Sequence, residues 1–221
     1  MRGLCLLGGS LLLVLIPVVC QAGIGGELDN FGSFGISVGA MRWLADADAR
    51  EFEGSTAQIR PMVKGVFRYR FNEAWLGTIE AGYGWNGYAD SGDLTTVVIP
   101  VTVGMERRLR ELWGATTSLA FGGGVYVWGQ RRDGEFLRDP ATSKRLQATD
   151  PGAYLGGVSE FHVSDHVTCT THLTVHYIYS THADDYPTLL GDDDIFTDLR
   201  IGLNYYFSPY EGLVWDTGDE D

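Results

Sequence analysis

Residues 68–85 read RYRFNEAWLGTIEAGYGW, and the pattern of this segment indicates the fold of the chain. Two runs of alternating residues flank the polar segment 72–74, a pattern typical of two antiparallel strands joined by a tight hairpin. After the turn, one face carries Trp75, Ile79, Ala81, Tyr83 and Trp85, and the other carries Thr78, Glu80, Gly82 and Gly84. One face of the hairpin is therefore apolar and aromatic, while the opposite face is small and polar.

The same alternation continues on both sides of this hairpin, and no helical period of useful length interrupts it. Eight strands are predicted, at 34–43, 57–71, 75–85, 94–107, 113–128, 153–163, 167–180 and 195–207. Long polar connections at 44–56, 86–93, 129–152 and 181–194 alternate with short ones at 72–74, 108–112 and 164–166. This regular alternation is typical of a barrel threaded through a membrane, with short turns on the inner side and longer loops outside.

Composition excludes several other classes of protein. The 221 residues include 30 Gly and 3 Cys, aromatic residues make up 12%, and the net charge is −13. Such an acidic chain lacks the basic surface of a nucleic-acid binder. Three cysteines exclude a disulfide scaffold and a four-cysteine zinc site, and no cofactor or metal is predicted. The mean hydropathy of −0.05, with a single long apolar run at the N-terminus, excludes a bundle of membrane helices.

The N-terminus has the pattern of a secretory signal peptide. Met1-Arg2-Gly3 is short and basic, residues 4–19 are apolar, and Cys20-Gln21-Ala22 offers small residues for cleavage after Ala22. The alternative is lipoprotein processing at Cys20. The segment 1–22 is therefore expected to direct export through the Sec pathway and to be removed. The mature chain then keeps only Cys169, which falls on the apolar face and is expected to act as a small hydrophobe.

Between the end residues of each strand, the charges all fall on the face opposite the apolar one. These residues are Arg60, Lys64, Arg68, Arg70, Glu80, Glu160, Asp198 and Arg200, with His172 and His176 on the same face. A water-soluble β-protein shows the same alternation with its apolar face inside, so alternation alone does not decide the orientation.

Three further features favour an apolar exterior. Aromatic residues gather at both ends of the apolar face, as membrane interfaces select. They are Phe71, Trp75, Trp113, Phe161, Tyr205 and Phe207 beside the short turns, and Tyr83, Trp85, Tyr177 and Tyr179 near the long loops. The other face is rich in Gly, Ser and Thr, which suit a narrow interior, and the strands reach the length that crosses a membrane at a tilt. The sequence therefore predicts an all-β, closed eight-stranded antiparallel up-and-down transmembrane β-barrel over residues 23–207.

Several segments carry a resemblance to a known family. The hairpin 68–85, together with 99–104, 156–161 and 203–207, resembles strands of small bacterial outer-membrane barrels. The chain is similar to the eight-stranded outer-membrane β-barrel family that includes the OmpA-type barrels. The resemblance implies a Gram-negative outer membrane, a monomeric barrel, contact with membrane lipid and lipopolysaccharide, and insertion by the barrel-assembly machinery. One departure is the acidic tail 208–221 after Phe207, which is expected to be a disordered extension or a short recognition peptide.

The charged interior is the best candidate site, and it allows two interpretations. Buried ions must pair, because an isolated buried charge is very costly. The residues named above would then form a salt-bridged plug that closes the barrel. The alternative is a narrow ion path, as in a small porin. The room inside eight strands, which side chains nearly fill, favours the plug.

Three other motifs are weaker. His162-Val-Ser-Asp-His166 is faintly similar to the His-x-Ser element of lipid A deacylases, but it falls at the inner end of its strand, so Ser164-Asp165 is better explained as a turn. The acidic loop 184–194 has carboxylates but not the spacing of a calcium loop. The loop 129–152 mixes five cations with four acids, and contact with lipopolysaccharide phosphates is a further hypothesis for it.

The sequence thus favours a non-enzymatic outer-membrane barrel with a structural, anchoring or surface-interaction role. No catalytic residues are predicted. The alternatives are a small passive channel, a lipid A hydrolase, and a soluble periplasmic barrel that binds an apolar ligand.

Overall fold

The computed structural model describes residues 31–45, 59–87, 94–138, 143–181 and 194–207. The predicted signal peptide 1–22 and the tail 208–221 lie outside these ranges, as do most of the long connections. No helix in the described ranges is long and apolar enough to cross a membrane. The long strands are β1 (Phe31–Ala45), β2 (Arg60–Arg70), β3 (Trp75–Gly87), β4 (Leu94–Leu112), β5 (Ala115–Arg132), β7 (Gln147–Ser164), β8 (Val167–Ile178) and β9 (Asp194–Tyr206). Between them, β6 (Glu135–Phe136) is a two-residue strand that pairs with the end of β5.

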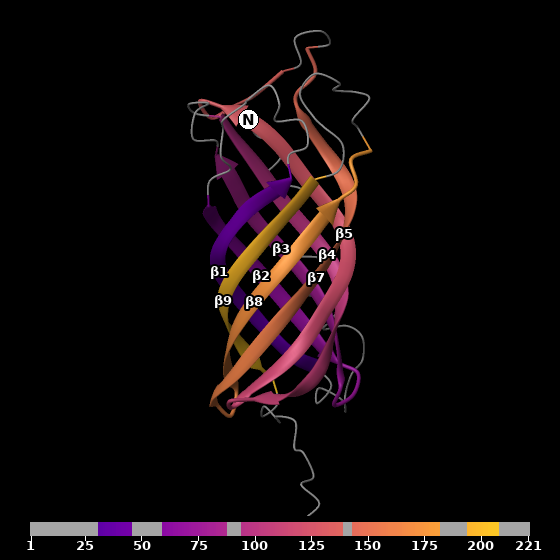
Figure 1. The fold of residues 1–221 in the computed structure, drawn as a ribbon, viewed down its shortest axis with the longest axis vertical. Coiled ribbons are helices and arrows are strands. Elements are labelled where there is room, and N and C mark those ends of the chain that lie inside the picture. The colour runs from indigo at the N-terminus through magenta and orange to yellow at the C-terminus, as the bar shows by residue number, and fades with distance from the viewer. Residues whose placement is uncertain (1–30, 46–58, 88–93, 139–142, 182–193, 208–221) are drawn as a thin grey trace, which may run out of the picture.

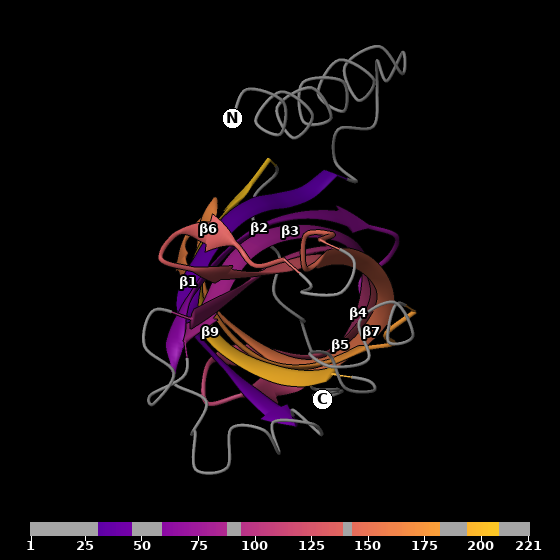
Figure 2. The ribbon, with the colours of Figure 1, turned by 90° about the horizontal axis from the view of Figure 1, so that it is seen from above.

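The long strands form one closed ring. Each pairs antiparallel with its neighbours, and the ring closes because β1 pairs with β9 and β4 pairs with β5. The strands run obliquely around a tall barrel (Figure 1), and the view along its length shows the closed ring (Figure 2). The predicted fold, a closed eight-stranded antiparallel barrel, is confirmed. Closure leaves no open strand edge around the ring, which an apolar surrounding requires.

The barrel carries its apolar residues outside and its ions inside. On β9, Ile201 and Leu203 are each 60% exposed, whereas Arg200 is 1% exposed. On β2, Val63 is 43% exposed, while Lys64 beside it is 1% exposed. A water-soluble protein would have the opposite arrangement. The outward face therefore has the character of a surface that contacts lipid.

The two ends of the barrel differ. The turns at 71–74, 113–114 and 165–166 lie at the end that we call the short-turn end, and the strands β1, β3, β5 and β8 run from it to the long-connection end (top in Figure 1). At the β2–β3 turn, Asn72 Oδ1 accepts hydrogen bonds from the backbone N–H groups of Ala74 and Trp75, at 2.9 and 3.0 Å. This side-chain cap explains how the polar segment 72–74 reverses the chain within so few residues.

Two of the predicted connections are wrong. The segment 129–152 is not one loop, because β5 continues to Arg132, β6 covers Glu135–Phe136 and β7 begins at Gln147. The segment 108–112 belongs to β4, and the actual turn is Trp113-Gly114. Both stretches have polar or charged residues on both faces, so the hydrophobic alternation that reveals a strand is lost there.

Candidate functional site in the barrel interior

The inward faces of four strands place a set of ions near mid-barrel, which we call the upper charge cluster (Lys64, Glu80, His176, Asp198 and Arg200). Asp198 lies at its centre: its Oδ2 is 2.8 Å from Lys64 Nζ, and its Oδ1 is 2.6 Å from Arg200 Nε. Glu80 Oε2 lies 3.8 Å from Lys64 Nζ and 3.6 Å from Arg200 Nη2. Each cation therefore contacts two carboxylates, and the cluster joins β2, β3 and β9.

His176 links the upper charge cluster to aromatic side chains. Its Nε2 is 2.9 Å from Asp198 Oδ2 and 3.0 Å from Lys64 Nζ, and its Nδ1 is 2.9 Å from the Tyr126 hydroxyl. The Phe196 ring stacks on the imidazole at 4.3 Å between centroids. Both ring nitrogens and one ring face are thus occupied, which fixes the orientation of the imidazole.

A second group of ions, which we call the lower charge cluster (Arg68, Glu106 and Glu160), lies towards the short-turn end. Arg68 Nε donates to Glu106 Oε1 at 3.0 Å, and Arg68 Nη1 is 3.6 Å from Glu160 Oε1. The same Glu160 oxygen accepts hydrogen bonds from the Thr168 hydroxyl at 2.6 Å and the Tyr206 hydroxyl at 2.8 Å. Arg68 is 0% exposed, so its charge is stabilised by protein groups rather than by bulk water.

Neutral polar side chains occupy the interior between the two clusters. His172 Nε2 lies 3.2 Å from Thr170 Oγ1, and Asn204 Nδ2 donates to the hydroxyls of Thr168 and Thr170 at 3.3 Å each. His172 is 2% exposed and pairs with Arg200 across the β8–β9 ladder. Polar contacts therefore extend from the lower cluster towards the upper one.

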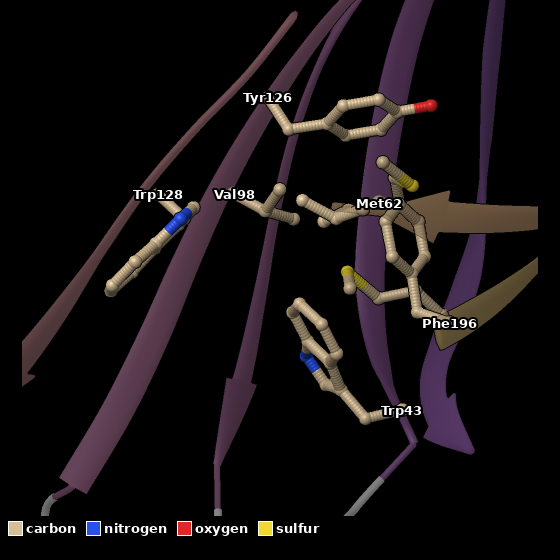
Figure 3. Packing of buried hydrophobic residues seen from close by; sticks show 8 residues of the cluster. Trp43, Met62, Val98, Tyr126, Trp128 and Phe196 are labelled. Carbon is tan, nitrogen blue, oxygen red and sulfur yellow. The ribbon is translucent and has the colours of Figure 1, made fainter. Parts of the chain in front are cut away.

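Above the upper charge cluster the interior becomes apolar. This apolar layer consists of Met41, Trp43, Met62, Val98, Tyr126, Trp128, Ile178 and Phe196 (Figure 3). Trp43 and Phe196 pack with their ring centroids 5.3 Å apart, and each member of the layer is at most 7% exposed. A packed layer of this kind excludes water from the interior near the long-connection end.

The Asp150 carboxylate accepts three hydrogen bonds at the rim of the barrel, beside the apolar layer. Its Oδ2 accepts a hydrogen bond from Trp128 Nε1 at 2.6 Å, and its Oδ1 accepts from the backbone N–H and the hydroxyl of Thr181 at 3.0 and 2.6 Å. Asp150 is 0% exposed. The carboxylate thus ties β5 and β7 to the segment that follows β8.

The structure places eight of the ten predicted interior residues at buried positions: Lys64, Arg68, Glu80, Glu160, His172, His176, Asp198 and Arg200. The other two, Arg60 and Arg70, are half-buried at the two ends of β2. The prediction missed Glu106, Arg108 and Asp150, which are buried as well. Arg108 and Asp150 lie outside the predicted strands, and Glu106 lies at the end of the predicted strand 94–107. All three continue the inward face of Thr102 and Tyr154, so face parity assigns them to the interior.

The predicted girdle residues lie on the outside. Phe71, Tyr83, Trp113, Phe161, Tyr177, Tyr179, Tyr205 and Phe207 are exposed, and Trp75 and Trp85 are half-buried. Trp113 differs from the prediction: it lies in a turn with φ of 52° and is 97% exposed, rather than beginning a strand.

The weaker motifs have simpler structural roles. His166 Nδ1 lies 2.9 Å from the Tyr206 carbonyl oxygen, and its ring stacks on Tyr205. Ser164 is exposed beside a turn at the short-turn end. Cys169 is half-buried. Among the described residues, no group of three or more His, Cys, Asp or Glu side chains is placed to hold a metal ion.

Comparison with known proteins identifies the fold. No family model matches the sequence, and no curated protein matches it. The crystal structure of Neisserial surface protein A is similar, with a TM-score of 0.55 and 11% identity over 79% of this chain and 96% of that one. Ail, the attachment invasion locus protein of Yersinia pestis (16% identity, 80% and 99% covered), and a major outer membrane protein of Thermus thermophilus (12%, 80% and 99%) both give TM-scores of 0.46. The likeness to Neisserial surface protein A shows that the chain has the fold of the small eight-stranded outer-membrane β-barrels.

Proposed function

We propose that this protein is a non-enzymatic outer-membrane barrel whose interior is closed by its own side chains. The barrel has a structural role and anchors in the membrane the surface that its long-connection end presents for interaction. The observation that carries the proposal is that side chains fill the interior of the barrel. Two ion-paired clusters lie below a packed apolar layer, and Arg68, Lys64, Asp198 and Arg200 are each at most 1% exposed. Eight strands leave room for side chains and little else.

The outward face supports the membrane location. It is apolar along β9 and β1, where Ile36 and Val38 are 56% and 57% exposed. Export through the Sec pathway with removal of residues 1–22, insertion by the barrel-assembly machinery, contact with lipid and lipopolysaccharide, and a monomeric barrel complete the proposal. A soluble periplasmic barrel does not fit, since this much apolar surface would face water.

Conductance across a planar lipid bilayer tests the closed interior. The wild-type protein should show no current steps above the background. The variant Met41→Ala/Phe196→Ala thins the apolar layer, and Phe121→Ala/Phe161→Ala is the control on the outward face, where both rings are exposed. Steps in the first variant alone would support the plug, and steps in the wild type would overturn it.

A passive channel is the second candidate function. The two charge clusters favour it, because they line much of the interior with polar groups. The apolar layer argues against a channel, because ions pass poorly through a constriction that excludes water. The conductance of the wild-type protein separates the two functions. An enzymatic role at Ser164 is tested by Ser164→Ala, which we expect to leave the acylation of lipid A unchanged.

A further inference from the structure

The described residues between β5 and β7, 133–138 and 143–146, extend the barrel wall at the long-connection end. Gln130 is its junction: the N–H of Gln130 donates to the Leu146 carbonyl at 3.0 Å, and the Gln130 carbonyl accepts from the N–H of Leu137 at 3.0 Å. The N–H of Leu146 donates in turn to the Leu137 carbonyl at 2.9 Å. Leu146 is 0% exposed. The segments 130–138 and 143–147 are therefore held by backbone hydrogen bonds and by burial of a leucine.

Two guanidinium groups lie over one aromatic ring of this extension. Arg131 Cζ lies 4.5 Å from the centroid of the Phe136 ring, and Arg145 Cζ lies 5.8 Å from it. Arg138 pairs directly with Arg145 across an antiparallel bridge, so the two side chains project from the same face. We call Arg131, Arg138 and Arg145 the arginine face.

The arginine face continues the outward wall of the barrel. Val125 and Val127 of β5 point outward and are 44% and 38% exposed. Gly129 follows on the same face, and a Cβ atom there would lie 2.8 Å from the Phe136 ring. Phe136 thus packs on the outer surface of β5 rather than over the barrel mouth. The guanidinium groups beside it lie directly above the apolar wall.

The height of the arginine face matches the edge of the apolar band. Trp85, an aromatic residue near the long connections, pairs with Val97 of β4, and Val97 pairs with Gly129 of β5. Arg131 follows Gly129 by two residues on β5, towards the long-connection end. Aromatic girdles mark the edges of the apolar band in such barrels, so the arginine face begins just beyond the outer edge of the band.

We propose that the arginine face binds the phosphate groups of the lipopolysaccharide that surrounds the barrel. The inference rests on the proposed outer-membrane location and names the lipid partner of one face. Guanidinium groups match phosphate with paired, charge-assisted hydrogen bonds. Arg138 Nη1 donates to the Ser143 carbonyl oxygen at 3.0 Å, and the bridge to Arg145 places the two exposed arginines side by side. Because the face follows the wall, its ligand is a headgroup beside the barrel.

The test measures lipid A retained by the full-length mature protein in detergent micelles, using native mass spectrometry. The two probes are bisphosphorylated lipid A and the same lipid with its phosphates removed. The test variant is Arg138→Gln/Arg145→Gln, in which both positions are exposed. The control is Arg107→Gln/Arg110→Gln, which removes the same charge from exposed positions at the opposite end.

We expect the wild type and the control to prefer the phosphorylated lipid by about tenfold, the equivalent of about 1.4 kcal/mol, and the test variant to lose that preference. Equal retention of the two lipids by the wild type overturns the inference, as does a test variant that keeps the preference. Binding of soluble inorganic polyphosphate that depends on the two arginines, without a lipid preference, also overturns it.

Heat-modifiable mobility and recovery in the outer-membrane fraction are measured in parallel. A wild-type protein that is folded and in the outer membrane but shows no preference refutes this inference alone, whereas loss of the membrane location refutes the proposed function.

Discussion

Lys64 and Asp198 are 134 residues apart in the chain, yet their side chains form a 2.8 Å ion pair inside the barrel. Lys64 is on β2 and Asp198 on β9, and β1 lies between these strands in the ring. The pair therefore spans the seam where the first and last strands meet. Both side chains are at most 1% exposed, so removing Asp198 leaves Lys64 buried without its nearest counter-charge.

Asp198→Ala should lower the free energy of unfolding by about 3–5 kcal/mol, because Lys64 and Arg200 both lose their closest carboxylate. Urea unfolding in lipid vesicles measures the change. Glu73→Ala, at an exposed turn position, is the control and should have an effect below about 0.5 kcal/mol. Equal effects of the two substitutions would contradict the role of the upper charge cluster.

The adjacent residues Tyr205 and Tyr206 offer a matched pair on opposite faces. Tyr206→Phe removes the hydroxyl that donates to Glu160 at 2.8 Å and should cost about 1.5–3 kcal/mol, as for a hydrogen bond to a charged group. Tyr205 is 52% exposed on the outside, and Tyr205→Phe should change stability little. Unfolding curves of both variants in the same vesicles provide the comparison. A larger effect at Tyr205 would mean that the two faces are exchanged.

Two glycines test how closely neighbouring strands approach one another. At Gly124, a Cβ atom would overlap the Val101 carbonyl oxygen of β4, whereas at Gly157 it would meet nothing within 4 Å. Gly124→Ala should therefore destabilise the barrel by about 1–3 kcal/mol through overpacking. Gly157→Ala should be neutral or stabilising by up to about 1 kcal/mol. Heat-modifiable mobility at increasing temperature ranks the variants, and a Gly157→Ala barrel that melts first would refute this packing.

The turn at Trp113-Gly114 has the same geometry as the turn at Asp133-Gly134. The first residue of each has φ of 52°, and the glycines have φ of 77° and 81°. Asp tolerates the left-handed region better than Trp. Trp113→Asn should therefore raise the free energy of unfolding in micelles by about 1 kcal/mol, and Asp133→Asn should leave it unchanged. A loss of stability for Trp113→Asn would show that contacts of the indole outweigh the strain of its backbone.

The sequence predicts the strands and their faces best where one side of the strand is apolar. On β9, Leu199, Ile201 and Leu203 alternate with Asp198 and Arg200, and both faces follow from that pattern. The same logic fails beyond the apolar band, because both sides of the strand are polar there. For this reason the predicted strands end short of Leu112 and Arg132, and the prediction places Asp150 in a loop.

The choice of ion-pair partners does not follow from the sequence. Parity assigns Lys64, Glu80 and Asp198 to the interior, but it does not show that Lys64 meets Asp198 rather than Glu160. That choice depends on the stagger between strands around the closed ring, which is a property of the whole circumference. The apolar layer has the same origin, because Trp43, Val98 and Phe196 come from three strands whose relative heights no local pattern specifies.

The seam between β1 and β9 has a consequence for biosynthesis. Twelve residues of β1, from Ser33 to Ala45, have register partners on β9, so the first-made strand of the barrel stays half unpaired until the last one has been translated. Assembly must therefore wait for an almost finished polypeptide. During that interval, the apolar side chains of Phe34, Ile36 and Val38 lie on an unpaired strand that is prone to aggregate. Other molecules of the cell envelope must cover this strand until the barrel closes.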